Sequence, residues 1–342
     1  MQFRDFTCGK DDDGRRLDRI LRIFLKDKSL GQIYKLIRKG LIKVNHNKTK
    51  PELHIKEGDL ISIASFLLEN TDGYDNPDIK KSASSSGGLQ IVFQNQHLLV
   101  IDKPYGRSVH GSEKDTASGL DKEVLFYYEK NIKASKEASL AFRPGPLHRL
   151  DRNTSGLLVF SLSLEGAKWF SDSIKNHTVQ KKYLGLAEGK IEQSEIWEDS
   201  IKASEQNAEN SEGFYTVTRA QSDEGKKAVT IAKPLAYGLL DKREFTLVEY
   251  TIKTGRKHQI RLQSQLHKHP LAGDKAYGGK GCGELKKEYY LHAYSLSFPK
   301  DNPLELPLEV KSPLPQDFKE LLSECELSNC EMSSCEIENL GL

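Results

Sequence analysis

Apolar and polar residues in the first part of the chain recur with the period of a helix and then of a strand. Apolar side chains at helical spacing predict two amphipathic helices, the second with Ser29 as its cap and Gly40 as its end. Short apolar runs then predict two strands. The expected helices are 15–27 and 31–39, and the expected strands are 42–45 and 59–63.

This periodicity is lost from residue 66 to residue 88, where a Ser/Gly-rich stretch predicts a flexible linker. From Leu89 onwards, strand-like and helix-like segments mix without a regular βαβ order, which favours an α+β fold. The expected strands are 91–93, 98–102, 157–162, 181–187 and 245–253, and the expected helices are 165–176, 256–267 and 318–322.

The chain therefore divides into four predicted parts: a small domain at 14–65, the linker at 66–88, a larger domain at 89–323 and a tail at 324–342. The tail repeats a five-residue unit that begins Cys-Glu, and its acidic composition predicts disorder. A soft-metal tract is the alternative, but it lacks histidine.

The net charge of +2 over 342 residues hides a strong local excess. Between Arg15 and Lys56 there are 13 Lys and Arg against three acids. Such a basic module indicates nucleic acid or an anionic membrane, although a solvated helical face gives the same composition. The candidate RNA contacts are Arg15, Arg16, Arg19, Lys35, Arg38 and Lys39.

Other classes find less support in the composition. The chain has no apolar run of membrane-spanning length and no signal-peptide core. Its five cysteines show neither CxxC spacing nor a histidine partner, so no zinc site or disulfide framework is predicted. We expect a soluble protein of a reducing compartment, most simply the bacterial cytoplasm.

Candidate chemistry lies in three separated segments, 148–156, 181–189 and 254–262. In the first, the acid Asp151 stands between Arg149 and Arg152 at the foot of a Thr-Ser-Gly turn. Taken alone, this segment is most simply an ordinary turn, because Asp, Asn, Ser and Gly are common turn formers.

Read together, the three segments resemble the RluA family of pseudouridine synthases. The first reads HRLDRNTSG, the second KKYLGLAEG and the third TGRKHQIRL, with roughly 30 and 80 residues between them. The resemblance runs from about Leu89 to Pro315 and is closest to the RluC type, which acts on large-subunit ribosomal RNA. The small basic domain resembles an S4 RNA-binding domain. Arg152-Asn153 and Lys257 depart slightly from the family pattern.

The resemblance implies an α+β catalytic domain with a mixed, largely antiparallel sheet and three catalytic residues. Asp151 would attack C1′ of a flipped-out uridine or remove the C2′ proton, and the sequence leaves both routes open. Arg261 would pair with this carboxylate and keep it ionised. Tyr183 would stack on the uracil ring and take the C5 proton.

Further binding residues are implied by the same resemblance. Leu262 and Leu291 would form apolar walls for the base, although both suit an ordinary core equally well. Arg149 would enter the RNA stack or contact phosphate, and Arg152 would contact RNA. We expect His148 and His258 to be structural or orienting groups.

Three functions stay open at this point. The first is isomerisation of uridines in 23S ribosomal RNA, as free RNA or in a pre-ribosomal particle, by a monomeric enzyme. The second is the same chemistry on tRNA, and the third is a non-catalytic RNA-binding factor of ribosome assembly. No metal or organic cofactor is implied, because the sequence has no ligand cluster, P-loop or GxGxxG motif.

Overall fold

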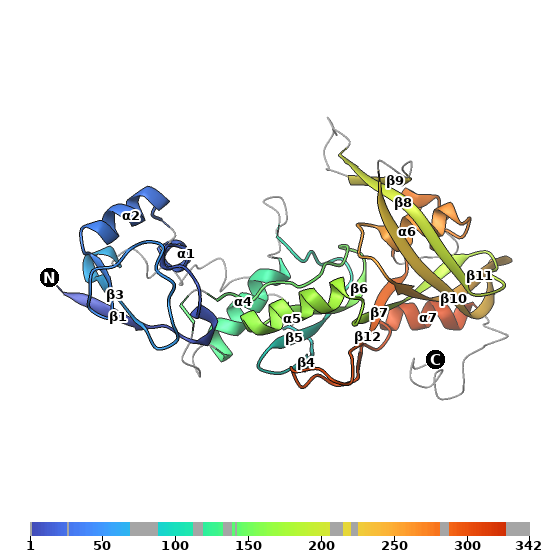
Figure 1. Cartoon of the computed structure of the whole chain (residues 1–342). Helices are drawn as coiled ribbons and strands as arrows, with labels where there is room; N and C mark the ends of the chain where they lie inside the picture. Colours follow the sequence, from blue (N-terminus) through green and yellow to red (C-terminus); the bar gives the residue numbers. More distant parts are fainter. Residues whose placement is uncertain are drawn as a thin grey trace.

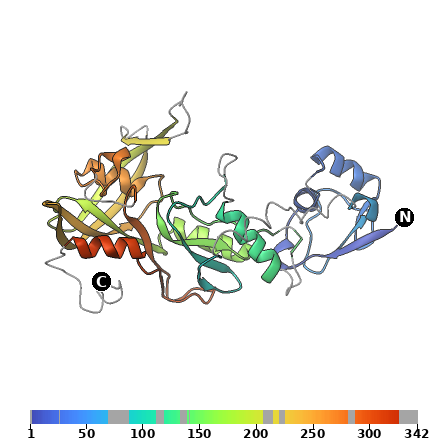
Figure 2. The same ribbon diagram turned by 180° about the vertical axis from the view of Figure 1, so that it is seen from behind.

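The computed structural model of the protein describes residues 2–25, 27–68, 88–111, 119–132, 139–140, 142–205, 215–219, 225–280 and 287–325. A small N-terminal unit lies at one end of the molecule, and a long sheet with its covering helices forms the rest (Figures 1 and 2). In these described ranges no helix has the length and apolar character to cross a membrane.

The N-terminal unit packs two helices on a three-stranded antiparallel sheet of order β1-β3-β2. Ser29 caps the second helix by accepting a hydrogen bond from the Gln32 amide, as predicted, and Gly40 ends it with a φ of +73°. The elements are β1 (Phe3–Thr7), α1 (Leu17–Phe24), α2 (Leu30–Arg38), β2 (Ile42–Val44) and β3 (Leu60–Ala64).

Two predictions for this unit need correction. Strand β1 was not expected, because Phe3–Thr7 holds too few apolar residues to show a clear period. The first helix begins at Leu17, with Arg16 as its N-cap residue in an extended conformation. Arg15 and Arg16 therefore precede the helix, which was expected to begin at residue 15.

The N-terminal unit contacts the rest of the chain through consecutive polar residues before α1. Asp12 is fully buried and accepts hydrogen bonds from the Ser139 hydroxyl (2.6 Å) and the Leu140 amide (2.9 Å). Asp11 accepts from the Leu164 amide at 2.8 Å. These hydrogen bonds favour one docked arrangement of the N-terminal unit, since losing them would leave the buried Asp12 carboxylate without its donors from the larger unit.

The larger unit is built on a ten-stranded sheet of order β4-β5-β6-β12-β7-β11-β10-β8-β9, with β13 paired to β12. Within the described residues, β6 and β12 form its one parallel pair. The strands are β4 (Ile91–Gln94), β5 (Leu98–Lys103), β6 (Ser155–Ser161), β7 (Gln180–Glu188), β8 (Glu195–Glu205), β9 (Tyr215–Arg219), β10 (Lys226–Leu240), β11 (Arg243–Ile252), β12 (Leu291–Ser297) and β13 (Glu309–Lys311).

Helices cover this sheet, and the predicted α+β class with a mixed, largely antiparallel sheet is confirmed. The helices are α4 (Leu120–Asn131), α5 (Leu164–Lys175), α6 (Gln259–Leu266) and α7 (Gln316–Glu324). Helix α4 and strands β8, β9, β10, β12 and β13 were not predicted. The long strand β10 contains Pro234 and Gly238, which disguise a strand in sequence, and its register is irregular near the proline.

The predicted boundaries of the linker and the tail are also altered. Leu68 is buried in the core of the N-terminal unit, and the predicted linker from 69 to 87 lies outside the described residues. Cys325 is fully buried against α7 and β10, where its carbonyl accepts from Leu239, so it belongs to the core. The remaining tail, 326–342, also lies outside the described residues.

Gly156 allows β6 and β12 to approach closely. It adopts a φ of +106°, and a Cβ atom there would lie 2.3 Å from the carbonyl oxygen of Ala293. Real side chains do not reach such a distance, so only glycine fits. The turn that holds Asp151 directly precedes this contact, and its position therefore depends on it.

We predict that Gly156→Ala lowers the free energy of unfolding by about 2–4 kcal/mol, because the methyl group clashes with backbone and the φ is strained. Urea denaturation followed by circular dichroism measures the effect. Gly145→Ala is the control, since nothing lies within 4 Å of a Cβ at that position. Equal stability of the two variants would contradict the importance of this close approach.

Candidate functional site

The candidate catalytic pocket lies where β6, β7, β12 and α6 meet. Its volume is about 360 Å³, which is within the range of ligand sites. The lining includes the turn before β6, the start of β7 and the segment between β11 and α6. Its residues are Leu147, His148, Arg149, Leu150, Asp151, Thr154, Ile174, Lys181, Tyr183, Ile252, Gly255, Arg256, Lys257, His258, Gln259, Ile260, Arg261 and Leu291.

Asp151 sits in a tight turn at the edge of this pocket. The Thr154 amide donates to the Asp151 carbonyl at 3.1 Å, and β6 begins at the next residue. The carboxylate side chain is 18% exposed, and its Oδ1 lies 3.7 Å from Nε2 of His258. The acid is thus held by backbone structure while its oxygens face the cavity.

Lys103 fixes this turn from beneath. Its ammonium group is buried and donates to the carbonyl oxygens of Pro104, Arg107 and Arg152, at 3.0, 2.8 and 2.8 Å. Burial lowers the pKa of Lys103 to about 7, although the negative charge of Asp151 opposes this effect. Lys103, which was not among the predicted site residues, therefore ties the 104–107 loop to the turn of Asp151.

Arg261 is part of the pocket, but its fork is occupied by a different carboxylate from the one expected. Its Nε and Nη2 both donate to Asp274 at 2.7 Å, and its guanidinium lies over the rings of Tyr277 and Tyr289. Burial lowers the pKa of Arg261, but the hydrogen bonds to Asp274 together with the charges of Tyr289, Asp274 and Asp151 outweigh that effect and leave the pKa raised. The predicted bidentate pair with Asp151 is therefore wrong, and Arg261 acts on Asp151 only through space.

Tyr183 projects from β7 into the same pocket and is 6% exposed. Its hydroxyl makes no hydrogen bond with any other described residue. Burial, and secondly the charge of Asp151, raise the pKa of Tyr183, so the phenol keeps its proton while Asp151 is ionised.

The two histidines of the motif segments have different surroundings. His148 accepts the Val159 amide at 3.2 Å, and burial lowers its pKa to about 3, so it is a neutral structural group. His258 contacts Tyr277 at 2.8 Å through Nδ1, and burial also lowers its pKa, with Asp151 opposing. His258 thus faces Asp151 as a neutral imidazole, which fits an orienting role.

The remaining predicted pocket residues are only partly brought together. Leu291 lines the pocket, as does Arg149, which is exposed at its rim. Leu262 is outside the pocket lining and packs in a small cluster with Ile201, Ala228 and Tyr277, so its contact with the base stays a prediction that the packing does not support. Arg152 is exposed and donates to the Gly106 carbonyl at 3.0 Å.

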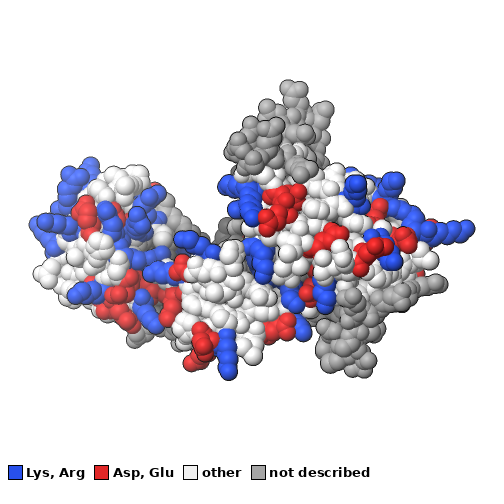
Figure 3. Space-filling view, turned by 45° about the vertical axis from the view of Figure 1, so that its right-hand side comes forward, with Lys and Arg blue, Asp and Glu red and all other residues white. Residues whose placement is uncertain are grey.

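Basic residues of the N-terminal unit are mostly exposed. Figure 3 shows most of the visible Lys and Arg of this unit on its upper part, with a few acids among them and a larger group of acids on its lower part. Arg16 differs, since it pairs with Asp18 at 2.7 Å. Arg15 is half-buried, and its Nη1 lacks a hydrogen-bond partner among the described residues. The exposed candidates are Arg19, Lys35, Arg38 and Lys39.

Comparison with known proteins identifies the family. A model of the family described as RNA pseudouridylate synthase matches residues 97–266, and an S4 domain model matches residues 15–61. A protein of Haemophilus influenzae named "Ribosomal large subunit pseudouridine synthase C" is 32% identical over 308 residues, covering 85% of this chain and 86% of the relative. The chain belongs to the RNA pseudouridylate synthase family.

Further relatives carry the same name. Those of Vibrio vulnificus and Escherichia coli are each 29% identical and cover 92% of this chain, and 93% and 94% of the relatives. The human protein "RNA Pseudouridylate Synthase Domain Containing 4" has the same fold, with a TM-score of 0.56 and 22% identity over 75% of this chain and 99% of that one. The predicted RluA-type enzyme with an S4 domain is confirmed.

We predict that Asp274→Asn lowers the free energy of unfolding by about 3–5 kcal/mol, because Arg261 would be left buried without its counter-charge. Displacement of the guanidinium should also reduce turnover by about 100-fold. Urea denaturation and single-turnover assays measure the two effects.

The double variant Arg261→Met/Asp274→Leu separates these effects. It removes both charges, so stability should recover while turnover stays low. Recovery of turnover in the double variant would show that this ion pair serves folding alone.

Proposed function

We propose that this enzyme converts specific uridines of large-subunit ribosomal RNA into pseudouridine, with Asp151 acting on the ribose of a flipped-out nucleotide. The observation that carries the proposal is the position of Asp151. It is a rigidly held, partly exposed carboxylate in a pocket that also contains Tyr183 and Leu291. The choice of ribosomal RNA follows from relatives that share the name and span almost the whole chain.

The pocket suits a base that has left its stack. An extruded uridine needs an apolar or aromatic surface against its ring, and Leu291, Ile252 and Tyr183 offer one. Arg149 stands exposed at the rim, where its planar cation can stack on the neighbouring bases. Extrusion costs a few kcal/mol, which phosphate contacts elsewhere would offset.

The reaction breaks the N1–C1′ bond and forms a C5–C1′ bond within one nucleotide. Asp151 starts it either by attack on C1′, which gives an ester, or by removal of the C2′ proton, which gives a glycal. The C5 proton is lost at the end, and N1 gains one. These steps involve no change of oxidation state and use only side chains and water, so the proposal includes no metal or organic cofactor.

The pKa of Tyr183 changes during this reaction. In the free enzyme the negative charge of Asp151 is one of two causes that raise the pKa of Tyr183. Either route removes that charge, since an ester and a protonated carboxyl are both neutral. The pKa of Tyr183 then falls from its resting value, so the phenol gives up its own proton to water more readily, and the phenolate that this leaves can accept the C5 proton.

The proposal extends to the setting of the enzyme. We expect it to act as a monomer in the cytoplasm, on free ribosomal RNA or on a pre-ribosomal particle. The S4 unit would supply phosphate contacts through exposed Arg19, Lys35, Arg38 and Lys39.

We predict that Asp151→Asn reduces turnover by several orders of magnitude while RNA binding is retained, because the amide cannot act as nucleophile or base. Carbodiimide-dependent reverse-transcription stops map pseudouridines in cells that carry the wild-type gene, no gene or the variant. The expected result is loss of particular stops in large-subunit RNA, restored by the wild type alone.

Other outcomes of this experiment discriminate between functions. Stops lost only from tRNA would keep the chemistry and overturn the substrate. Unchanged stops throughout would favour an RNA-binding assembly factor. Residual activity within tenfold of the wild type would overturn the role of Asp151.

We also predict that replacing Lys35, Arg38 and Lys39 together by Gln weakens RNA binding and flattens its salt dependence. The log–log slope should fall by roughly 0.7–0.9 for each phosphate that the variant no longer neutralises. Fluorescence anisotropy at several salt concentrations measures it. The control replaces three exposed lysines of the larger unit, Lys130, Lys242 and Lys300, by Gln; an equal change in both variants would argue against a specific surface.

A further inference from the structure

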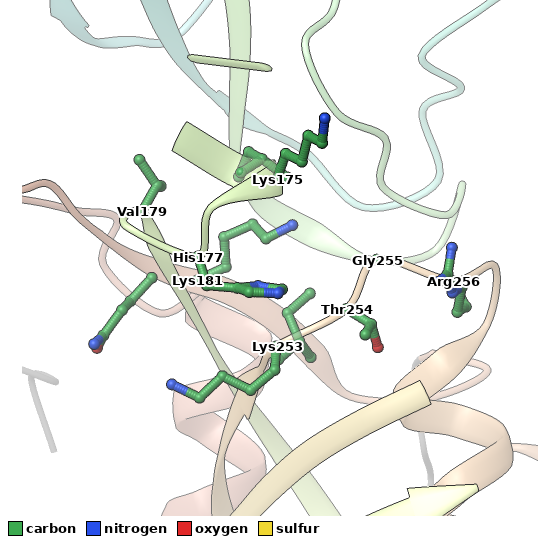
Figure 4. Close-up of a pocket in the computed structure, with 11 residues that line it drawn as sticks. Lys175, His177, Val179, Lys181, Lys253, Thr254, Gly255 and Arg256 are labelled. Atoms are coloured by element: carbon green, nitrogen blue, oxygen red, sulfur yellow. The ribbon is translucent and has the colours of Figure 1, made fainter. Parts of the chain in front are cut away.

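A second pocket adjoins the catalytic pocket and has a volume of about 290 Å³. Figure 4 shows its lining, which comes from the end of α5 and the turn after it, from the start of β7 and from the end of β11 with the loop that follows. The two pockets share five lining residues: Ile174, Lys181, Ile252, Gly255 and Arg256.

The lining of this second pocket is strongly basic. It includes Lys175, Lys181, Lys253 and Arg256, together with His177, and it contains no Asp or Glu. None of the three lysines forms an ion pair or side-chain hydrogen bond with another described residue. Arg256 uses its Nε to donate to the Lys227 carbonyl at 3.1 Å and leaves the rest of its fork exposed.

Lys181 is the unusual member of this set, because it is only 8% exposed. A buried ammonium ion normally has a counter-ion, since taking an unpaired charge out of water is unfavourable. Here burial lowers the pKa of Lys181 to about 8, and in the described part of the chain no carboxylate opposes the shift. The other buried cations, Lys103 and Arg261, both have oxygen partners.

The ammonium of Lys181 lies against the loop after β11. A Cβ atom at Gly255 would be 3.6 Å from Lys181 Nζ. Glycine at this position therefore leaves the approach to the ammonium free of side-chain atoms. The exposed Gly255 and Arg256 form the rim of both pockets, so a chain that enters the catalytic pocket passes close to Lys181.

We propose that the second pocket binds the backbone phosphate of a nucleotide next to the flipped-out uridine, with Lys181 as its buried anchor and Arg256 at its rim. The inference rests on the proposed function, because it names how the same site holds its RNA. A phosphodiester supplies the anion that Lys181 lacks, and charge-assisted hydrogen bonds to phosphate are among the stronger ones. In RNA a phosphate follows each nucleotide, which matches two adjoining pockets that share this lysine.

The test removes charge from either partner. A short RNA that contains the mapped target uridine is prepared in several forms. Each form carries one neutral methylphosphonate, placed at one of the two nearest phosphates on the 5′ side or on the 3′ side of that uridine. Each RNA is assayed with the full-length wild type and with Lys181→Met, Arg256→Gln and Lys300→Met. Lys300 is an exposed lysine outside both linings, and its replacement removes the same charge.

At one phosphate position, the methylphosphonate should lower the kcat/KM of the wild type and of Lys300→Met by about tenfold to a hundredfold. With Lys181→Met the same RNA should show no further loss, because the interaction is already gone. Arg256→Gln, which changes an exposed side chain, should show partial coupling at the same position. If the losses in kcat/KM from the methylphosphonate and from Lys181→Met multiply at every position, the two act independently and the inference is overturned. Conversion of uridine by the wild type would still leave the proposed function intact.

Stability gives a second readout that a structural role would not produce. Lys181→Met should raise Tm by about 2 °C, because an unpaired buried charge is replaced by an apolar side chain of similar length. A fall in Tm together with normal kcat/KM would mean that Lys181 serves folding, and would overturn the inference.

A titration with inorganic phosphate tests whether the pocket binds an RNA backbone phosphate or a free phosphate ion. Calorimetric titration should show that phosphate binds the wild type weakly, and that intact RNA displaces it. Phosphate binding that depends on Lys181 but persists in saturating RNA would assign the pocket to a free phosphate and overturn the RNA assignment.

Discussion

The close backbone approach between β6 and β12 is the contact on which the site depends. Gly156 lacks a side chain, so the backbone of Ala293 can lie against it in the one parallel pair of the described sheet. The turn of Asp151 ends where this contact begins, and Leu291 opens β12 on the other side. The contact that joins two parts of the sheet thus brings the proposed catalytic acid and the proposed apolar wall together.

Two buried cations near Asp151 are engaged elsewhere, which leaves the carboxylate available. Lys103 binds backbone carbonyls beneath the turn, and Arg261 is held by Asp274 between two aromatic rings. A carboxylate in a bidentate pair has its lone pairs occupied and is a weaker nucleophile. Asp151 keeps the benefit of nearby positive charge without that restriction, and this suits both proposed routes.

Recognition of RNA, in this view, is divided between two units of the chain. The exposed basic helices of the S4 unit would act through long-range, salt-dependent attraction, while the buried Lys181 would act at short range beside the reacting nucleotide. The small overall charge of +2 leaves these local concentrations of charge to direct the RNA. Docking through the buried Asp12 holds the S4 unit against the catalytic unit.

Sequence by itself determined the features that are local. The capped helix at Ser29, half of the strands of the large sheet and the acid-bearing turn before β6 follow from periodicity and turn chemistry, which act between residues close in the chain. Only tertiary structure decided that Asp274 holds Arg261, that Leu262 is outside the pocket lining and that Lys181 is buried without a counter-charge. Those outcomes depend on contacts between segments that are distant in the chain, and the residue pattern of one segment does not specify which other segments pack against it.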